Sequence, residues 1–243
     1  MATRIRVVSY NIAKGASLFG TKMRLDGVRL ALHTLNADVV CLQEVQNHNT
    51  RRSASSSQLD TLATIGLEHS AYGANKHYPH GHHGNAILSK QPITAQHNLD
   101  LSVRKVERRG LLHTELMLNN RPLHVLSTHF SLMARDRLEQ AKTLTDYIET
   151  HIPADAALVL AGDFNDWHRR VDQHLRRSLH PIQEVFDHAH SLPARTFPSV
   201  FPVLRLDRIY VRNLMVAHAQ VPAGRVWAGH SDHRPIIADL LWS

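Results

Sequence analysis

The chain of 243 residues is 43% hydrophobic and carries a formal net charge of +7 at pH 7 with histidine neutral. This length suits one large domain or two small ones, and the apolar content is enough to bury a core. No apolar stretch is long enough for a transmembrane helix, and the single cysteine excludes an internal disulfide. The basic balance favours an anionic partner, although an ordinary basic protein has the same composition.

The N-terminal segment Met1–Asn11 passes almost directly into strand-like alternation and has no apolar signal region. Cys41 stands in the apolar run Val39–Leu42, which predicts a small core residue rather than a reactive thiol. These features together predict a protein of the reducing cytoplasm.

Strands are predicted in chain order at Arg4–Tyr10, Asp38–Gln43, Asn85–Leu88, Ile93–Leu99, Leu111–Leu118, Leu123–Ser127, Ala156–Ala161, Arg205–Val211, Met215–Val221 and Ile236–Leu241. Arg205–Val211 and Met215–Val221 resemble a pair of strands. Asn119–Pro122 is a plausible hairpin turn, and the serine-rich Arg51–Ser57 indicates a loop.

Helical spacing is found at Leu25–Leu35, Gln58–Ile65, Ala134–His151 and His168–Leu179. The clearest case is Ala134–His151, where Leu138, Leu144 and Ile148 share a face and Pro153 ends the helix. Many short strands, few helices and no internal repeat predict two packed sheets with helices outside, in a single domain spanning residues 1–243.

Two motifs carry most of the chemical information. Gly162–Asn165 reads Gly-Asp-Phe-Asn and follows the predicted strand Ala156–Ala161, whereas Gly229–Pro235 reads Gly-His-Ser-Asp-His-Arg-Pro and precedes Ile236–Leu241. Each motif places a carboxylate where a strand meets a loop, which is where catalytic groups usually lie. Aspartate, asparagine and histidine without thiolates suit a hard divalent ion and phosphate chemistry.

Five further fragments at predicted strand ends join these motifs: Tyr10-Asn11, Gln43-Glu44-Val45, Gly84–Ser89, Ser127-Thr128-His129 and Leu206–Tyr210. In this order the chain resembles the endonuclease/exonuclease/phosphatase superfamily from Tyr10 to Pro235. The resemblance implies an α+β fold, a four-layer α/β/β/α sandwich with two packed, mainly antiparallel sheets. It also implies a metal-dependent hydrolase of phosphoester bonds that uses in-line attack of an activated water.

The resemblance also implies roles for individual residues. The implied metal ligands are Asn11, Glu44 and Asp232, and the implied catalytic residues are His129, Asp163, Asn165, Asp207 and His233. Asp163 would orient or deprotonate water, and Asp207 would hold His233. Asn85 would line the cleft, and Arg109 would lie near the substrate phosphate.

Structural alternatives exist for most of these residues. Asn11 is also typical of a turn after a strand, and Asp163 is also typical of an Asx-turn. Glu44 alone is consistent with a surface carboxylate, Asp207 with an ion pair to Arg208, and Arg109 with a solvated charge run.

Three features outside the motifs need an interpretation. His77, His80, His82 and His83 are expected to form an irregular, histidine-rich polar loop, in preference to an accessory metal or phosphate site, since Pro79 and Gly81 interrupt the segment. The pairs Arg169-Arg170 and Arg176-Arg177 share a predicted helix that would be either a solvated face or a contact for a polyanion. Asp166 is expected to cap that helix.

The implied cofactor is Mg²⁺ or Mn²⁺, and the implied partner is a phosphate ester. Nucleic acid, anionic phospholipid and small phosphate esters all fit the basic charge, although few aromatic residues are present for stacking on nucleic acid. We expect a monomer. A noncatalytic binding module with the same fold is the alternative from another class.

Overall fold

The computed structural model describes residues 2–15, 25–49, 57–63 and 66–242, and its strands form two sheets of six. The first sheet has the order β11 (Met215–Gln220), β12 (Ile236–Trp242), β1 (Thr3–Asn11), β2 (Val39–Asn49), β4 (Gly81–Ser89) and β3 (His69–Tyr78). The second has the order β5 (Ile93–Asp100), β6 (Gly110–Leu118), β7 (Arg121–His129), β8 (Ala157–Asp163), β10 (Asp207–Arg212) and β9 (Gln183–Glu184).

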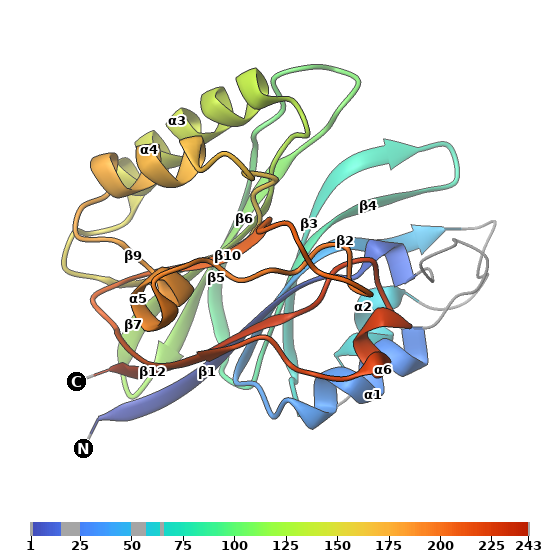
Figure 1. Ribbon diagram of the computed structural model, residues 1–243, viewed down its shortest axis with the longest axis horizontal. Coiled ribbons are helices and arrows are strands. Elements are labelled where there is room, and N and C mark those ends of the chain that lie inside the picture. Colours follow the sequence, from blue (N-terminus) through green and yellow to red (C-terminus); the bar gives the residue numbers. More distant parts are fainter. Residues whose placement is uncertain (1, 16–24, 50–56, 64–65, 243) are drawn as a thin grey trace.

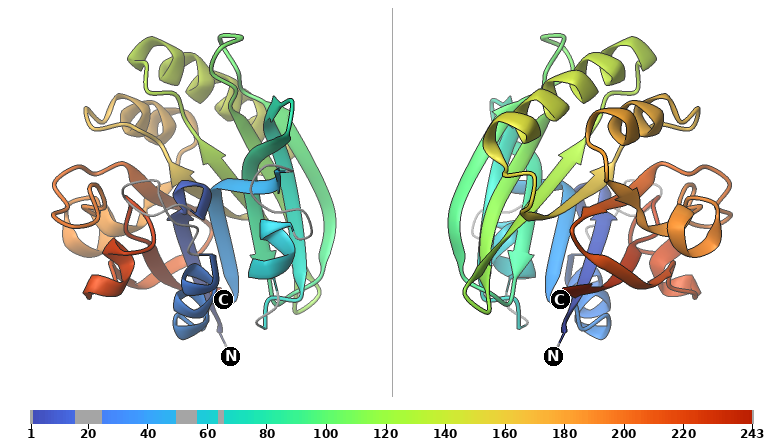
Figure 2. Two further views of the ribbon diagram at one scale, coloured as in Figure 1. Left: turned by 90° about the vertical axis from the view of Figure 1, so that its right-hand side faces the viewer. Right: turned by 90° about the vertical axis from the view of Figure 1, so that its left-hand side faces the viewer.

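Most of the helices lie on the outer faces of the two sheets (Figures 1 and 2). The described helical segments are η1 (Ala13–Gly15), α1 (Leu25–Thr34), α2 (Gln58–Leu62), α3 (Ala134–His151), α4 (Arg170–Ser178), α5 (Val185–His190) and α6 (Arg225–Ala228). Residues of α1 and α2 pack on the first sheet, and residues of α3 and α4 pack on the second. The predicted four-layer α/β/β/α sandwich is confirmed. None of the described helices combines the length and the apolar character needed to cross a membrane.

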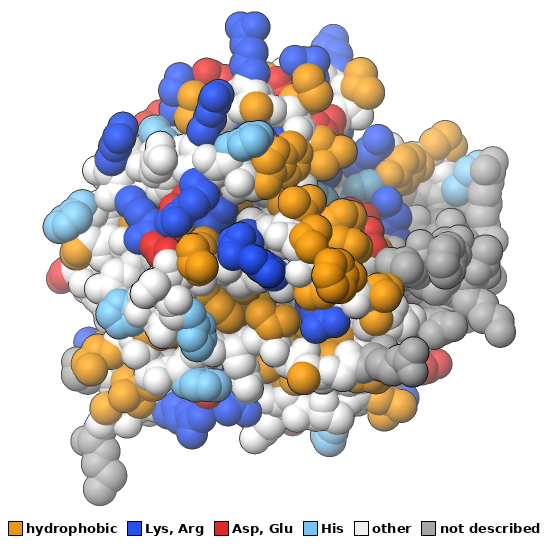
Figure 3. All heavy atoms as spheres, in the orientation of Figure 1, with side chains coloured by type: hydrophobic (Ala, Val, Ile, Leu, Met, Phe, Trp, Pro, Cys, Tyr) orange, Lys and Arg blue, Asp and Glu red, His pale blue; other side chains and the backbone are white. Residues whose placement is uncertain are grey.

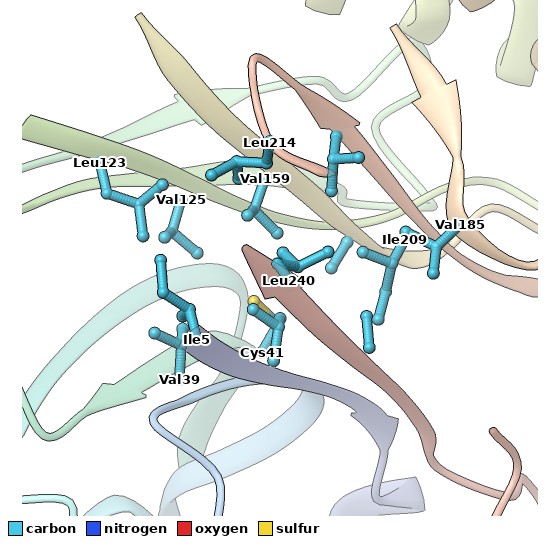
Figure 4. Close-up of a cluster of buried hydrophobic side chains, with 14 of the residues drawn as sticks. Ile5, Val39, Cys41, Leu123, Val125, Val159, Val185, Ile209, Leu214 and Leu240 are labelled. Carbon is cyan, nitrogen blue, oxygen red and sulfur yellow. The ribbon is translucent and has the colours of Figure 1, made fainter. Parts of the chain in front are cut away.

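Alternation along the strands builds the core. Val7 faces the space between the sheets, whereas Val8 packs toward α1, because successive side chains of a strand point to opposite faces. Figure 4 shows the inter-sheet cluster, in which Cys41 and Leu240 of the first sheet meet Val159 of the second. Cys41 is a buried core residue, as predicted, and burial raises the pKa of its thiol to about 12.

The strand directions bring the motif residues to one edge. Most neighbouring strands are antiparallel, but β1 pairs with β2 in parallel and β7 pairs with β8 in parallel. The register places His129 of β7 and Asp207 of β10 on either side of Asp163 in β8. Residues distant in sequence therefore become direct neighbours at the carboxyl ends of the parallel strands.

Most predicted elements are present with small shifts of their ends, and Ala134–His151 is a helix as predicted. The hairpin turn at Asn119-Asn120 is also present, with both residues at positive φ, which matches the twist of the flanking strands. The predicted loop at Arg51–Ser57 lies outside the described residues except for Ser57, and residues 64–65 of the predicted helix Gln58–Ile65 do as well.

One expectation was wrong. The histidine-rich segment is not an irregular loop: β3 and β4 form a hairpin in which His77 pairs with His82, and Pro79 is confined to the turn. Arg205–Val211 and Met215–Val221 do form strands, yet β10 belongs to the second sheet and β11 to the first. The antiparallel partner of β11 is β12, so long-range pairing overrides the proximity of the two strands in sequence.

The buried Glu184 generates a prediction about stability. It stands opposite Tyr210, and its Oε2 accepts a hydrogen bond from the backbone N of Asp187 at 2.6 Å. Burial raises the pKa of its carboxyl group from 4.5 to about 7. The folded protein therefore keeps this proton at pH values where the unfolded chain releases it. The free energy of unfolding falls as pH rises from about 4.5 to about 7.

We expect the Glu184→Gln variant to lose this pH dependence and to gain about 3 kcal/mol relative to the wild type above pH 7. Urea unfolding at pH 5 and pH 8 measures the difference. Glu149→Gln, at an exposed position of α3, is the matched control. Equal pH slopes for the wild type and Glu184→Gln would show that the carboxyl group is not perturbed.

Candidate active site

The carboxylate of Asp163 is the centre of a cluster of side chains from three parts of the fold. Its Oδ2 lies 3.1 Å from Asn11 Nδ2, 3.5 Å from His129 Nε2 and 3.6 Å from His233 Nε2. Asn11 ends β1, His129 ends β7 and His233 precedes β12. Asp163 itself is only 1% exposed. A buried carboxylate needs such partners, because an unpaired charge away from water is costly.

The local structure explains the residue type at the positions of the Gly-Asp-Phe-Asn motif. A Cβ at Gly162 would stand 2.0 Å from the backbone O of Thr128, so glycine permits the close approach of β7 and β8. Phe164 is buried between Phe130 and Tyr210 and anchors the loop after β8. Asn165 has a φ of 48° and donates from its backbone N to Asp163 Oδ1 at 3.0 Å. The Asx-turn is therefore real, and it also orients the carboxylate.

Asp207 and His233 form a buried dyad. His233 Nδ1 lies 2.8 Å from Asp207 Oδ2, and Thr196 Oγ1 donates to the same oxygen at 2.5 Å. The backbone N of His233 donates to Ser231 Oγ at 3.2 Å, which fixes the start of the side chain. Asp207 does not pair with Arg208, whose Nη2 donates to the backbone O of Asp166 at 2.8 Å.

The two histidines beside Asp163 are driven to opposite charge states. Burial opposes protonation of His233, but the charges of Asp207 and Asp163 and the hydrogen bond to Asp207 raise its pKa to about 10. Burial and the nearby charge of Arg109 lower the pKa of His129 to about 4. At pH 7 the cluster holds one imidazolium and one neutral imidazole. Titratable groups with pKa values forced apart are a mark of acid–base sites.

Glu44 lies on the opposite side of His129 from Asp163. A bulge in β2 gives Glu44 a φ of 56°, which directs its carboxylate toward the cluster edge. Its Oε2 lies 3.0 Å from Lys14 Nζ, and its Oε1 lies 4.0 Å from His129 Nδ1. Burial would raise the pKa of Glu44, but the charge of His129, which is protonated only below about pH 4, and the charge of Lys14 lower it to about 2. The carboxylate is therefore ionised and already faces a cation.

Asp232 joins the cluster less directly. It is half-buried, and Ser231 Oγ lies 3.3 Å from its Oδ1. The same hydroxyl donates to the backbone O of Asn11 at 2.6 Å, which fastens the loop before β12 to the end of β1.

Asn85 and Arg109 occupy the sides of the cluster. Asn85 Nδ2 donates to the backbone O of Gly110 at 2.9 Å and of Ser127 at 3.3 Å, so it connects β4 of one sheet to strands of the other. The mostly buried Arg109 lies 2.7 Å from Glu107 Oε1, and its charge acts on His129. Arg109 is therefore not part of a solvated charge run.

Arg169, the residue before α4, and Arg176 within it have a structural role. Arg169 and Arg176 both contact the buried Asp172, at 2.8 and 2.9 Å, and both contact Asp187, at 3.1 and 2.7 Å. These guanidinium groups are paired within the protein, which argues against a contact with phosphates of a polyanion. The expectation that Asp166 is the N-cap was wrong, because Arg169 holds that position. Asp166 still supports the start of the helix, since its carboxylate accepts from the backbone N of residues 170 and 172.

The histidine-rich hairpin borders the site through its tyrosine partners. Tyr72 Oη lies 3.0 Å from His82 Nδ1, and Tyr78 Oη lies 2.8 Å from His83 Nδ1. Burial and the charge of Lys14 lower the pKa of His83 to about 4. His83 is thus a neutral residue near Lys14 and Glu44.

Sequence reasoning missed three contributors: Lys14, Thr196 and Ser231. Lys14 follows Asn11 by three positions, and Ser231 stands inside the Gly-His-Ser-Asp-His motif, so both carried a positional signal. Thr196 precedes Asp207 by eleven positions in an irregular segment, and no local pattern marks it.

Comparison with known proteins defines the class. The model of the Endonuclease/Exonuclease/phosphatase family matches residues 8–233. The chain belongs to this family. Escherichia coli K12 protein YbhP is 37% identical over 97% of this chain and 95% of its own length.

Solved structures share the fold at lower identity. An endonuclease/exonuclease/phosphatase from Beutenbergia cavernae superposes with a TM-score of 0.81 at 20% identity, over 99% of this chain and 72% of that one. A humanized D. rerio TDP2 superposes with a TM-score of 0.73 at 17% identity, over 98% of each chain.

The paired arginines of α4 yield a prediction about stability. Arg176→Ala removes two contacts to acidic groups, one of them buried, and we expect a loss of about 1–3 kcal/mol in unfolding free energy. Arg177→Ala, at an exposed position of the same helix, should change stability by less than about 0.5 kcal/mol. Denaturant unfolding compares the two. Equal effects would show that the ion pairs do not support the fold.

Proposed function

We propose that the protein is a divalent-metal-dependent hydrolase of phosphoester bonds that acts by in-line attack of an activated water. The observation that carries the proposal is the buried Asp163 carboxylate between a charged His233 and a neutral His129. Membership of a family of nucleases and phosphatases supports the same reaction class.

The residues present fit a hard cation. Glu44 is ionised, and its carboxylate already balances the positive charge of the Lys14 ammonium group. Asn11, Glu44 and Asp232 would hold Mg²⁺ or Mn²⁺, because carboxylate and amide oxygens are their preferred ligands. When bound, the ion would supply Lewis-acid polarisation of a phosphoryl oxygen and a more acidic water.

Asp163 is the residue best placed to act on the attacking water. Asn11 and the backbone N of Asn165 hold the carboxylate at both oxygens, so its orientation is fixed before substrate enters. It would accept a proton or a hydrogen bond from the water and align it with the phosphorus. Fixed orientation of a reacting group removes an entropic part of the barrier.

The imidazolium of His233 would donate from Nε2 to a nonbridging phosphoryl oxygen. Asp207 accepts a hydrogen bond from Nδ1 of His233 and keeps the ring in one orientation. Thr196 donates to the same carboxylate and keeps it in place. Arg109 would add a second positive group toward the phosphate. Preorganised donors at the position of developing charge are the largest single contribution in many enzymes. Neutral His129 and Asn165 would contact the leaving group or a phosphate oxygen.

Apolar side chains are exposed on segments that leave the cluster. Leu132 and Met133 follow β7 and are 60% and 51% exposed, and Phe201 is 75% exposed in the segment before β10. Figure 3 shows that hydrophobic side chains gather to the right of the centre on the face seen in Figure 1. We propose that the substrate carries an apolar part beside its phosphate, which suits an anionic phospholipid.

Nucleic acid is the second candidate, and Trp167 is the observation that favours it. The indole ring is 40% exposed, follows the Gly-Asp-Phe-Asn motif closely, and has the Arg137 guanidinium 4.6 Å from its centroid. Exposed aromatic rings stack with unpaired bases. One fold neighbour is D. rerio TDP2 in complex with a single-strand DNA product, at 17% identity.

Metal removal tests the reaction class. We expect hydrolysis of a generic phosphodiester or of a phospholipid to fall to background with EDTA and to return with Mg²⁺ or Mn²⁺. The panel should include anionic phospholipid vesicles, single-stranded DNA, abasic duplex, RNA and inositol phosphates. Activity that survives complete chelation contradicts the metal role. Metal binding by calorimetry without hydrolysis anywhere in the panel would instead indicate a noncatalytic binding module.

The dyad gives a second test. Asp207→Asn should reduce kcat by roughly 10²- to 10⁴-fold, because it removes the charge that keeps His233 protonated and oriented. The alkaline limb of the pH–rate profile should move to lower pH. His233→Ala should be at least as damaging, and the double variant little worse than His233→Ala alone. Multiplicative losses, with unfolding free energies equal to that of wild type, would show that the two residues act independently.

A further inference from the structure

A second group of metal-ligating side chains lies away from the Asp163 cluster. His113 and Glu115 belong to β6 and His124 to β7, and one ligand atom from each lies within 4.8 Å of the other two. His124 precedes His129 by five residues, which is roughly 16 Å along a strand. The group shares the sheet face of Leu111 and Leu126, which pack with α3, so it does not face the interior between the sheets.

The spacing of the ligand atoms matches a small tetrahedral ion. His113 Nε2 lies 3.0 Å from His124 Nδ1, and His124 Nδ1 lies 3.9 Å from Glu115 Oε1. An ion with bonds of about 2.0–2.1 Å in tetrahedral geometry holds its ligand atoms roughly 3.3 Å apart. Small shifts of the Glu115 side chain, which is 39% exposed, would complete the fit.

The site has the supporting partner that metal-binding histidines use. Tyr147 of α3 places its Oη 3.0 Å from His113 Nδ1, which fixes the ring and leaves Nε2 directed at His124. His97 and His151 both stack with the Tyr147 ring, with centroids 5.7 and 4.3 Å away. Such outer hydrogen bonds orient the ligand and raise its basicity.

The group also has an open side. A hollow of about 310 Å³ is lined by His113, Glu115 and Tyr147 together with neighbours on β5 and α3. His113, only 7% exposed, lines this hollow, and its Nε2 lies 3.0 Å from Nδ1 of the buried His124. Water can therefore reach a fourth coordination position.

We propose that His113, His124 and Glu115 bind Zn²⁺, with a water as the fourth ligand. Two imidazoles and one carboxylate are a ligand set of zinc sites with an open position, and nitrogen ligands disfavour Mg²⁺. The ion fastens β6 to β7, and through Tyr147 it fastens both strands to α3. This site is independent of the phosphoester chemistry assigned to the Asp163 cluster.

Zinc titration of the full chain tests the proposal. The chain is first freed of metal and then titrated with Zn²⁺ by calorimetry, and with Co²⁺ to follow the visible absorption that nitrogen coordination in a tetrahedral site produces. Both titrations use a Glu44→Gln background, which weakens any binding at the Asp163 cluster. We expect this background to retain one tight equivalent of Zn²⁺ and the Co²⁺ absorption.

Variants assign that equivalent to named residues. His124→Gln should abolish it, and Glu115→Gln and Tyr147→Phe should each weaken it by at least about tenfold. His97→Gln is the matched control, because His97 lines the same hollow without offering a ligand atom, and it should bind as the background does. If His124→Gln fails to fold, the Glu115→Gln variant, at a partly exposed position, shows whether the Zn²⁺ equivalent is bound at this group.

Two results would overturn the proposal. The first is a Glu44→Gln protein that binds no tight Zn²⁺, which would leave His113 and His124 as a hydrogen-bonded pair without an ion. The second is an equivalent of Zn²⁺ that Glu115→Gln and His124→Gln both retain, which would place the ion elsewhere, for example on Asp163, Asp207 and His233.

Discussion

The burial of one carboxylate, Asp163, sets the arrangement of the whole candidate site. A charge away from water must be met by donors and opposite charge, and here the donors come from β1, from the loop after β8 and from the segment before β12. The requirement explains why Gly162 must lack a side chain, because only then can β7 and β8 approach in the register that places His129 beside Asp163. It also explains the polar connections between the sheets at this edge, such as Asn11 to Asp163 and Asn85 to Ser127.

The Asp163 carboxylate lies between two histidines that differ in charge. His233 is held between Asp163 and Asp207, and the sum of their charges outweighs the effect of burial on its pKa. His129 is equally close to Asp163 but also lies near Arg109, and burial lowers its pKa. One edge of the fold thus carries a fixed carboxylate, a charged imidazole and a neutral imidazole, and the Glu44–Lys14 ion pair lies beside them.

Sequence reasoning predicted what local pattern and strand order determine. The strand ends at Asn11, His129 and Asp163 were visible as apolar runs followed by polar residues, and family resemblance supplied their common edge. Thr196 was invisible because its contact with Asp207 depends on tertiary structure alone. The placement of β10 and β11 in different sheets depends on long-range strand pairing. The histidine-rich hairpin of β3 and β4 was missed for a local reason, since Pro79 and Gly81 near its turn indicate an irregular segment. The ion pairs of Arg169 and Arg176 were open to two interpretations until Asp187, from a different helix, was placed beside them.

The most direct test is an NMR pH titration of the imidazole nitrogens in the metal-free protein, which measures the protonation state of His233 and His129. We expect that His233 stays protonated through pH 7 and titrates near 10, while His129 stays neutral down to about pH 4. In Asp207→Asn, the titration of His233 should move toward lower pH. Titration of both rings near the ordinary histidine pKa of 6.5 would contradict the division of roles around Asp163.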